Sequence, residues 1–230
     1  MQPTIGVLML ETRFPRLYGD AGNPSTWPFP VQIAVVRGAS PERVVRDEAD
    51  GLLDAFVAAG SSLAAQGVDA ITTTCGFLVL HQRTLARRLP LPFASSSLLQ
   101  IPSIVALLPA DKRVGIVTVD SSSLTRRHLE AIGVDPSTPI SGTETGSELT
   151  RALLGNETRL DPVAAQRDVM NAARSLVQQH PDVGAIVLEC ANMPPYASAV
   201  ASALQLPVYD WYSMVCWFAR GLRPRAFFSR

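Results

Sequence analysis

The sequence lacks any electrostatic or hydrophobic feature that would attract a nucleic acid or a bilayer. Lys plus Arg and Asp plus Glu each number 20, which gives a formal net charge of zero, and no run of about 20 apolar residues is present. The N-terminal Met1–Thr4 has no basic residue ahead of the short apolar stretch that follows, so no export signal is visible. Because 47% of the residues are hydrophobic, the chain can still bury a real core. We therefore expect a globular, cytoplasmic protein with no nucleic-acid or membrane partner.

Lysine, cysteine and histidine are scarce, which argues against two kinds of cofactor. The chain has a single lysine, Lys112, in a polar turn before a predicted strand, whereas a pyridoxal phosphate enzyme needs a lysine for its Schiff base. The cysteines are Cys75, Cys190 and Cys216, too few and too far apart for a disulfide scaffold or a zinc knuckle. The histidines are His81, His128 and His180, and none is paired at metal-ligand spacing. The sequence therefore predicts an enzyme or binding protein with no cofactor and no metal.

Short β-rich runs alternate with helical patterns along the whole chain, which is typical of an α/β protein with parallel sheets. Strands are predicted at residues 5–10, 32–36, 68–74, 91–93, 113–119, 139–141, 183–188 and 207–209. Helices are predicted at residues 47–66, 77–89, 97–108, 123–132, 147–154, 162–179, 194–204 and 211–220. One long irregular stretch, 13–30, is rich in Gly and Pro, and loops of this length are usually lids or binding loops.

The chain contains an internal repeat. After a shift of 115 residues, eight of the 25 positions from 68 to 92 are identical, and Cys75 aligns with Cys190. The first strands also match, since Ile5-Gly6-Val7 resembles Val114-Gly115-Ile116. The repeat predicts two pseudo-symmetric lobes, each a mainly parallel sheet flanked by helices, with an active site between the lobes.

Each aligned cysteine comes directly after a buried strand and before a helix. In open α/β sheets the ligand cleft lies beyond the carboxyl ends of the strands, and a helix N-terminus there favours a thiolate. Two lobes would then present Cys75 and Cys190 to one cleft from opposite sides. One sulfur can take a proton from a carbon while the other delivers a proton to the opposite face, as stereoinversion requires. Nearby backbone amides and the Thr and Asn side chains can hold a carboxylate and stabilise the enolate-like intermediate.

The two cysteine segments, Thr-Thr-Thr-Cys75-Gly-Phe and Leu-Glu-Cys190-Ala-Asn-Met-Pro-Pro, together with the repeat resemble the aspartate/glutamate/hydantoin racemase superfamily. The resemblance extends over almost the whole chain. It implies two α/β lobes with an interlobe active site, chemistry without a cofactor, and a homodimer or higher homo-oligomer. In that family the last helix commonly returns to the first lobe, which implies a first lobe of residues 1–97 plus 211–230 and a second of 98–210.

The resemblance also implies site residues. Cys75 and Cys190 correspond to the catalytic pair, and retaining both argues against an arylmalonate decarboxylase, which keeps only the second. The substrate-binding candidates are Asn23, Thr74, Gly76, Phe77, Ser121, Ser122, Ala191 and Asn192. Two positions depart from the amino-acid racemases, which often carry Asn-Thr after the first cysteine and Gly before the second. Glu189, which stands before the second cysteine here, is expected to point away from it toward a structural partner, and Cys216 is expected to pack in the core.

These features predict a racemase or epimerase that inverts the carbon α to a carboxylate in an amino acid, or in a related small acid or hydantoin. A second interpretation is a cis-trans isomerase of an unsaturated diacid, in which one cysteine adds covalently to the substrate. A third is a non-catalytic, two-lobed protein that binds a small molecule between its lobes.

Overall fold

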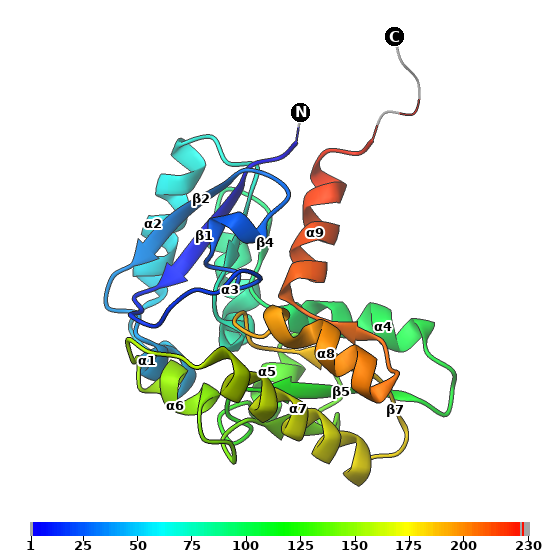
Figure 1. Cartoon of the computed structure of the whole chain (residues 1–230). Coiled ribbons are helices and arrows are strands. Elements are labelled where there is room, and N and C mark those ends of the chain that lie inside the picture. The colour runs from blue at the N-terminus through cyan, green and yellow to red at the C-terminus, as the bar shows by residue number, and fades with distance from the viewer. Residues whose placement is uncertain (1, 226, 228–230) are drawn as a thin grey trace.

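The computed structural model describes residues 2–225 and 227, and within them the chain forms two four-stranded parallel sheets (Figure 1). The strands of the first sheet are β1 (Ile5–Leu10), β2 (Val31–Val36), β3 (Ala70–Thr73) and β4 (Phe93–Ala94), in the order β2-β1-β3-β4. The strands of the second are β5 (Arg113–Thr118), β6 (Ile140–Gly142), β7 (Val183–Leu188) and β8 (Val208–Tyr209), in the order β6-β5-β7-β8. The predicted α/β fold of two similar lobes is confirmed.

The two sheets have equivalent strand orders, so β3 and β7 occupy the same place in their sheets. Both are short runs of apolar and β-branched residues, and β3 is buried along its whole length, as expected when helices cover both faces of a parallel sheet. β3 pairs with β1, and β7 pairs with β5. As a result, the segments that carry Cys75 and Cys190 leave equivalent strand ends.

The helices lie outside the sheets. They are α1 (Pro41–Val45), α2 (Leu53–Ala65), α3 (Gln82–Arg88), α4 (Ile101–Leu107), α5 (Arg126–Glu130), α6 (Leu149–Leu154), α7 (Pro162–Gln179), α8 (Pro194–Leu204) and α9 (Trp211–Leu222). Short 3-10 helices cover Pro24–Thr26, Gly76–His81 and Ser97–Gln100. Within residues 2–225 and 227, no helix has the length and apolar character needed to cross a membrane.

Three differences from the sequence prediction have local causes. The helix expected from residue 47 begins at Leu53, because Glu48, Ala49 and Gly51 adopt positive φ angles of 50°, 58° and 67°. The segment after Cys75 begins as a 3-10 helix and becomes α-helical only in α3. Helix α1 was not predicted; Ser40 caps it by accepting the backbone N–H of Arg43.

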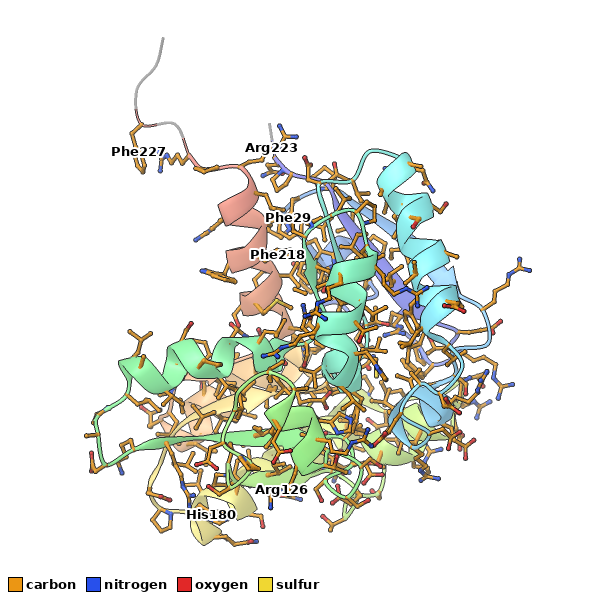
Figure 2. The ribbon with its side chains drawn as sticks, turned by 180° about the vertical axis from the view of Figure 1, so that it is seen from behind. Phe29, Arg126, His180, Phe218, Arg223 and Phe227 are labelled. Atoms are coloured by element: carbon orange, nitrogen blue, oxygen red, sulfur yellow. The ribbon has the colours of Figure 1, made fainter. Side chains whose placement is uncertain are left out.

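Helix α9 leaves the second sheet and packs beside the first (Figure 1). Its Trp211 and Met214 are buried in one apolar cluster with Ile5 and Ala70 of the first sheet. Phe218 of α9 and Phe29, both labelled in Figure 2, pack against that cluster. The lobe boundaries, 1–97 plus 211–230 and 98–210, stay a prediction, as do the homo-oligomer and the cytoplasmic location. Residues 1, 226 and 228–230 of the predicted first lobe lie outside the described part of the chain.

Candidate active site

Cys75 and Cys190 line the same cavity, although they come from different sheets. Cys75 follows β3 in an extended conformation (φ −148°, ψ 115°) and precedes the 3-10 helix Gly76–His81. Cys190 comes two residues after the end of β7. The two residues are 7% and 8% exposed, so neither thiol is open to bulk solvent. The cavity has a volume of about 30 Å³, which suffices for roughly one or two water molecules.

The walls of the cavity are mostly apolar, with a few polar groups. Its lining residues are Leu10, Phe14, Arg16, Pro41, Val45, Thr74, Cys75, Gly76, Phe77, Leu153, Leu154, Glu189, Cys190 and Asn192. Electrostatic interactions are strong in such a site because little water is present to screen them.

Burial raises the pKa of both thiols. The pKa of Cys75 rises to about 12, first because the group is desolvated and second because the Glu189 carboxylate lies near it. The backbone N–H groups of Phe77 and Leu78 act in the opposite direction. The pKa of Cys190 is raised well above its usual value by the same two causes, burial and Glu189. In this closed arrangement both sulfurs are therefore thiols at neutral pH, and a thiolate would need a positive charge beside it.

Glu189 is the acidic residue of the cavity. Its side chain is fully buried, and its Oε2 accepts a hydrogen bond of 2.7 Å from the hydroxyl of Thr118 in β5. Its Oε1 has no hydrogen-bond partner, and burial raises the pKa of the carboxyl to about 7. A Cβ on residue 76 would collide with Oε1, so Gly76 is what leaves room for this carboxylate.

The side chain of Glu189 does not point away from the cavity as the sequence predicts. A structural partner is present in Thr118, but the carboxyl group also faces the cavity that Cys190 lines. The physical reason is that β7 ends at Leu188, so the in-and-out alternation of a strand no longer applies one residue later. The only available sequence signal was the position of the glutamate directly before a cysteine.

The long loop 13–30 covers the cavity. Phe14 and Arg16 from this loop line the cavity, and Arg16 forms an ion pair of 3.0 Å with the buried Asp20. The loop is tied to the second cysteine segment by the backbone N–H of Ala21, which donates to the carbonyl of Ala191 over 3.0 Å. Since the cavity is smaller than any organic acid, the loop or the lobes must move apart to admit one.

A chain of side-chain hydrogen bonds runs from this loop to Cys190. The amide nitrogen of Asn192 donates to Asp20, which turns the amide oxygen of Asn192 toward the second cysteine. That oxygen accepts a hydrogen bond from the Cys190 thiol at 3.4 Å. Burial raises the pKa of Asp20, whereas Arg16 lowers it. Asp20 and Arg16 belong to the loop 13–30, which the sequence predicts as a lid or binding loop, but the contact to Asn192 depends on a loop course that no local pattern reports.

The structure brings together Cys75, Cys190, Thr74, Gly76, Phe77 and Asn192, with Ala191 fully buried beside them. It does not place Asn23, Ser121 or Ser122 in the wall of the cavity. The amide of Asn23 donates to the Arg16 carbonyl, the hydroxyl of Ser121 bonds to Glu144, and that of Ser122 donates to Asp120 at 2.6 Å.

No group of three His, Cys, Asp or Glu side chains is arranged as a metal site in the part of the chain that the structure describes. Lys112 is exposed and bonds to the Pro181 carbonyl at 3.4 Å, and it does not line the cavity.

Comparisons with known proteins agree with this architecture. A family model described as Asp/Glu/Hydantoin racemase matches residues 101–219. The dimethylsulfoniopropionate lyase of Durusdinium sp. clade D is 28% identical over 229 residues, covering 95% of this chain and 74% of that protein. Dimethylsulfoniopropionate lyase 6 of Emiliania huxleyi (strain CCMP1516) is 31% identical over 225 residues; the match covers 93% of this chain and 58% of the relative's length.

Among solved structures, allantoin racemase from Klebsiella pneumoniae superposes with a TM-score of 0.68 at 18% identity, covering 96% of this chain and 87% of that chain. This likeness concerns the fold. Because the family model covers more than half of the sequence, the chain belongs to the Asp/Glu/hydantoin racemase family.

Proposed function

We propose that this protein removes the proton from the carbon α to the carboxylate of a small acid, with Cys75 and Cys190 as the proton-transfer pair. The observation that carries the proposal is that thiols from equivalent strand ends of two sheets line one buried cavity. A substrate bound there has its α-carbon between the two sulfurs. If one sulfur takes the proton and the other returns one from the opposite face, the carbon is inverted. The protein is then a racemase or epimerase of an amino acid, related small acid or hydantoin that needs no pyridoxal phosphate.

The two thiols have different neighbours, which supports different roles in one direction of the reaction. Cys75 is approached by two backbone N–H groups, those of Phe77 and Leu78, whereas Cys190 is approached by one, that of Asn192; since such groups stabilise a thiolate, we assign Cys75 the role of base. Cys190 donates its proton to the Asn192 amide oxygen, a bond that only the thiol can make, so we assign it the role of acid. In the opposite direction the roles exchange.

The charge that develops on the substrate needs stabilisation. Arg16 supplies the positive charge among the lining residues, so we assign it to the substrate carboxylate. A fixed positive group in an apolar site stabilises the enolate-like intermediate more strongly than the same group would in water.

A second candidate function is an elimination, which begins with the same step. Relatives named dimethylsulfoniopropionate lyase align over 93% and 95% of this chain. In dimethylsulfoniopropionate the sulfonium is bonded to the carbon next to the α-carbon. When the α-proton moves to a thiolate, the electron pair forms the carbon–carbon double bond and the carbon–sulfur bond breaks. The products are dimethyl sulfide and acrylate, and the thiol returns its proton to solvent.

One experiment separates these functions. The purified protein is incubated in deuterated water with enantiopure amino acids, hydantoins, small 2-substituted acids and dimethylsulfoniopropionate, and the mixtures are followed by NMR and chiral chromatography. A racemase gives α-deuterium together with loss of optical purity, and a lyase gives acrylate and dimethyl sulfide in equal amounts. A panel without exchange, inversion or elimination contradicts the proposal. A stable thioether adduct with an unsaturated diacid points instead to the cis-trans isomerase.

A further inference from the structure

The Glu189 carboxylate is a buried acceptor that the proposed proton transfer does not use. Its Oε2 is held by Thr118, whereas its Oε1 is buried without a partner. Buried polar atoms are nearly always hydrogen-bonded, and a buried carboxylate without a counter-charge is costly. An orphaned acceptor in a ligand cavity therefore indicates a group that arrives with the ligand.

The charges around the cavity indicate what kind of group that is. Arg16 is positive and its charge is matched by Asp20 at 3.0 Å, while its buried Nε has no partner and remains able to bind the substrate carboxylate. Glu189 has no such cation partner among the described residues. A substrate with only a carboxylate would add a second negative charge to this site. A substrate with a carboxylate and a cationic group would instead place its cation against Glu189.

A cation in the cavity would also help the proposed chemistry. Both thiols have raised pKa values, and the negative charge of Glu189 is one cause in each case. A positive group beside Glu189 cancels that effect and favours a thiolate at the sulfur that accepts the proton. The ligand that satisfies Glu189 therefore also favours ionisation of the base.

We infer that Glu189 is a specificity-determining residue that binds the cationic group of a zwitterionic substrate, a small acid that also carries an ammonium or sulfonium group. Gly76 contributes by leaving space for the carboxylate. This inference rests on the proposed function, because it assumes that substrate occupies the cavity between the cysteines. It excludes plain monocarboxylates and uncharged hydantoins as preferred substrates.

Binding of two ligands of equal shape tests the inference without requiring turnover. The ligands are 3-(trimethylammonio)propionate, a permanent zwitterion, and 4,4-dimethylpentanoate, in which carbon replaces the charged nitrogen. Calorimetry at pH 8 is expected to show at least tenfold tighter binding of the zwitterion, since the opposite charges attract strongly in a buried site whereas the uncharged group gains no such attraction. In Glu189→Gln the preference is expected to disappear. Glu130→Gln, which changes an exposed acid on α5, is the matched control and should keep the preference.

The pH dependence supplies a second measurement on the unsubstituted protein. The pKa of Glu189 is raised to about 7, so its ionised fraction falls about tenfold between pH 8 and pH 6. The affinity for 3-(trimethylammonio)propionate should fall by that factor between pH 8 and pH 6. The affinity for 4,4-dimethylpentanoate should not fall. The other ionisable groups facing the cavity are Cys75, Cys190 and Arg16, with Asp20 behind Arg16, and they remain in the Glu189→Gln variant, which should lose the pH effect.

The outcomes separate this inference from the proposed function. Equal affinities of the two ligands at pH 8, or an undiminished preference in folded Glu189→Gln, overturns the zwitterion site. If that variant does not fold, Glu189→Asp keeps the charge at a shorter reach and should show a reduced preference; an unchanged preference there also overturns it. Zwitterion preference without any α-proton exchange or elimination would leave the binding site intact and contradict the proposed reaction.

Discussion

The two cysteine segments occupy equivalent places in the two lobes, yet their chemical surroundings differ. Each follows the third strand of its sheet, and each thiol is buried. The residue before the first is Thr74, whose hydroxyl accepts the backbone N–H of Leu10 at 3.2 Å within its own lobe. The residue before the second is Glu189, whose Oε1 is unpaired. The difference shows that a repeated scaffold places and buries the two sulfurs, while an unrepeated neighbour, Glu189, adds to the effect of burial on their pKa values.

The largest expected effect comes from removing either sulfur. Cys75→Ser and Cys190→Ser should each lower the rate of α-proton exchange by about 10²–10⁴-fold, because a serine hydroxyl is a far weaker acid than a thiol and does not ionise to an alkoxide that could take the proton. Isotope exchange in deuterated water measures the rates in both directions. Each variant should be slower in removing the proton from one enantiomer than from the other, with opposite preferences.

Cys216→Ser is the control for this comparison, since Cys216 does not line the cavity. It should retain the parent rate. If Cys75→Ser and Cys190→Ser lost the same fraction of the exchange rate for both enantiomers, the different surroundings of the two sulfurs would not give them different roles.

The repeat made the pair of cysteines predictable from the sequence, because strands and helix starts leave local patterns. The helices 162–179 and 194–204 and the strand 183–188 were predicted with the bounds that the structure shows. The turn at Glu48 and Ala49 was not, since non-glycine residues at positive φ have no reliable sequence signal. The position of Arg16 over the cavity depends on the path of a long loop, and the direction of Glu189 depends on the residue at which β7 ends.

The pH dependence of the free energy of unfolding should distinguish the second cysteine segment, which contains Glu189, from the first. The folded pKa of Glu189 is raised to about 7 from an ordinary 4.5, so the native state binds more protons than the unfolded state between these values. The contribution of this residue to stability is therefore greatest below pH 4.5 and is lost as pH rises through 7. The loss amounts to about 3 kcal/mol.

Urea unfolding of the parent and Glu189→Gln at pH values from 4.5 to 8 measures this contribution as a difference. The variant should gain stability relative to the parent as pH rises, and Asp20, whose pKa is also raised, cancels because both proteins contain it. A difference that does not vary with pH would show that Glu189 keeps the same charge throughout. Thr74→Val, at the equivalent position of the first lobe, should give a pH-independent difference.

Substitution of the small residues that follow the two cysteines, Gly76 and Ala191, should change the stability of the fold by unequal amounts. Gly76→Ala places a methyl group against the Glu189 carboxylate and backbone, and should destabilise the fold by about 1–3 kcal/mol. Ala191→Gly, the equivalent site, removes one buried methyl and should cost about 1 kcal/mol. Thermal unfolding measures both. The double variant Gly76→Ala with Glu189→Gln tests the cause: a smaller effect of the alanine in this background than in the parent identifies the carboxyl group as the obstacle, and an equal effect contradicts it.

The smallest effects are expected at the loop after β5, which the family resemblance marked as a substrate-binding loop. Ser122 donates to Asp120 at 2.6 Å, and Ser121 bonds to Glu144, so both hydroxyls already serve the turn. Ser122→Ala should lower the unfolding free energy by about 0.5–1.5 kcal/mol and change the exchange rate less than twofold. Ser121→Ala should lower the unfolding free energy by less, because the hydrogen bond of Ser121 to Glu144 is exposed to solvent. A tenfold rise in KM for either variant, with an unchanged unfolding free energy, would contradict this expectation. It would show that the loop contacts the substrate once the lobes have moved, and that the second lobe contributes more to binding than the closed arrangement indicates.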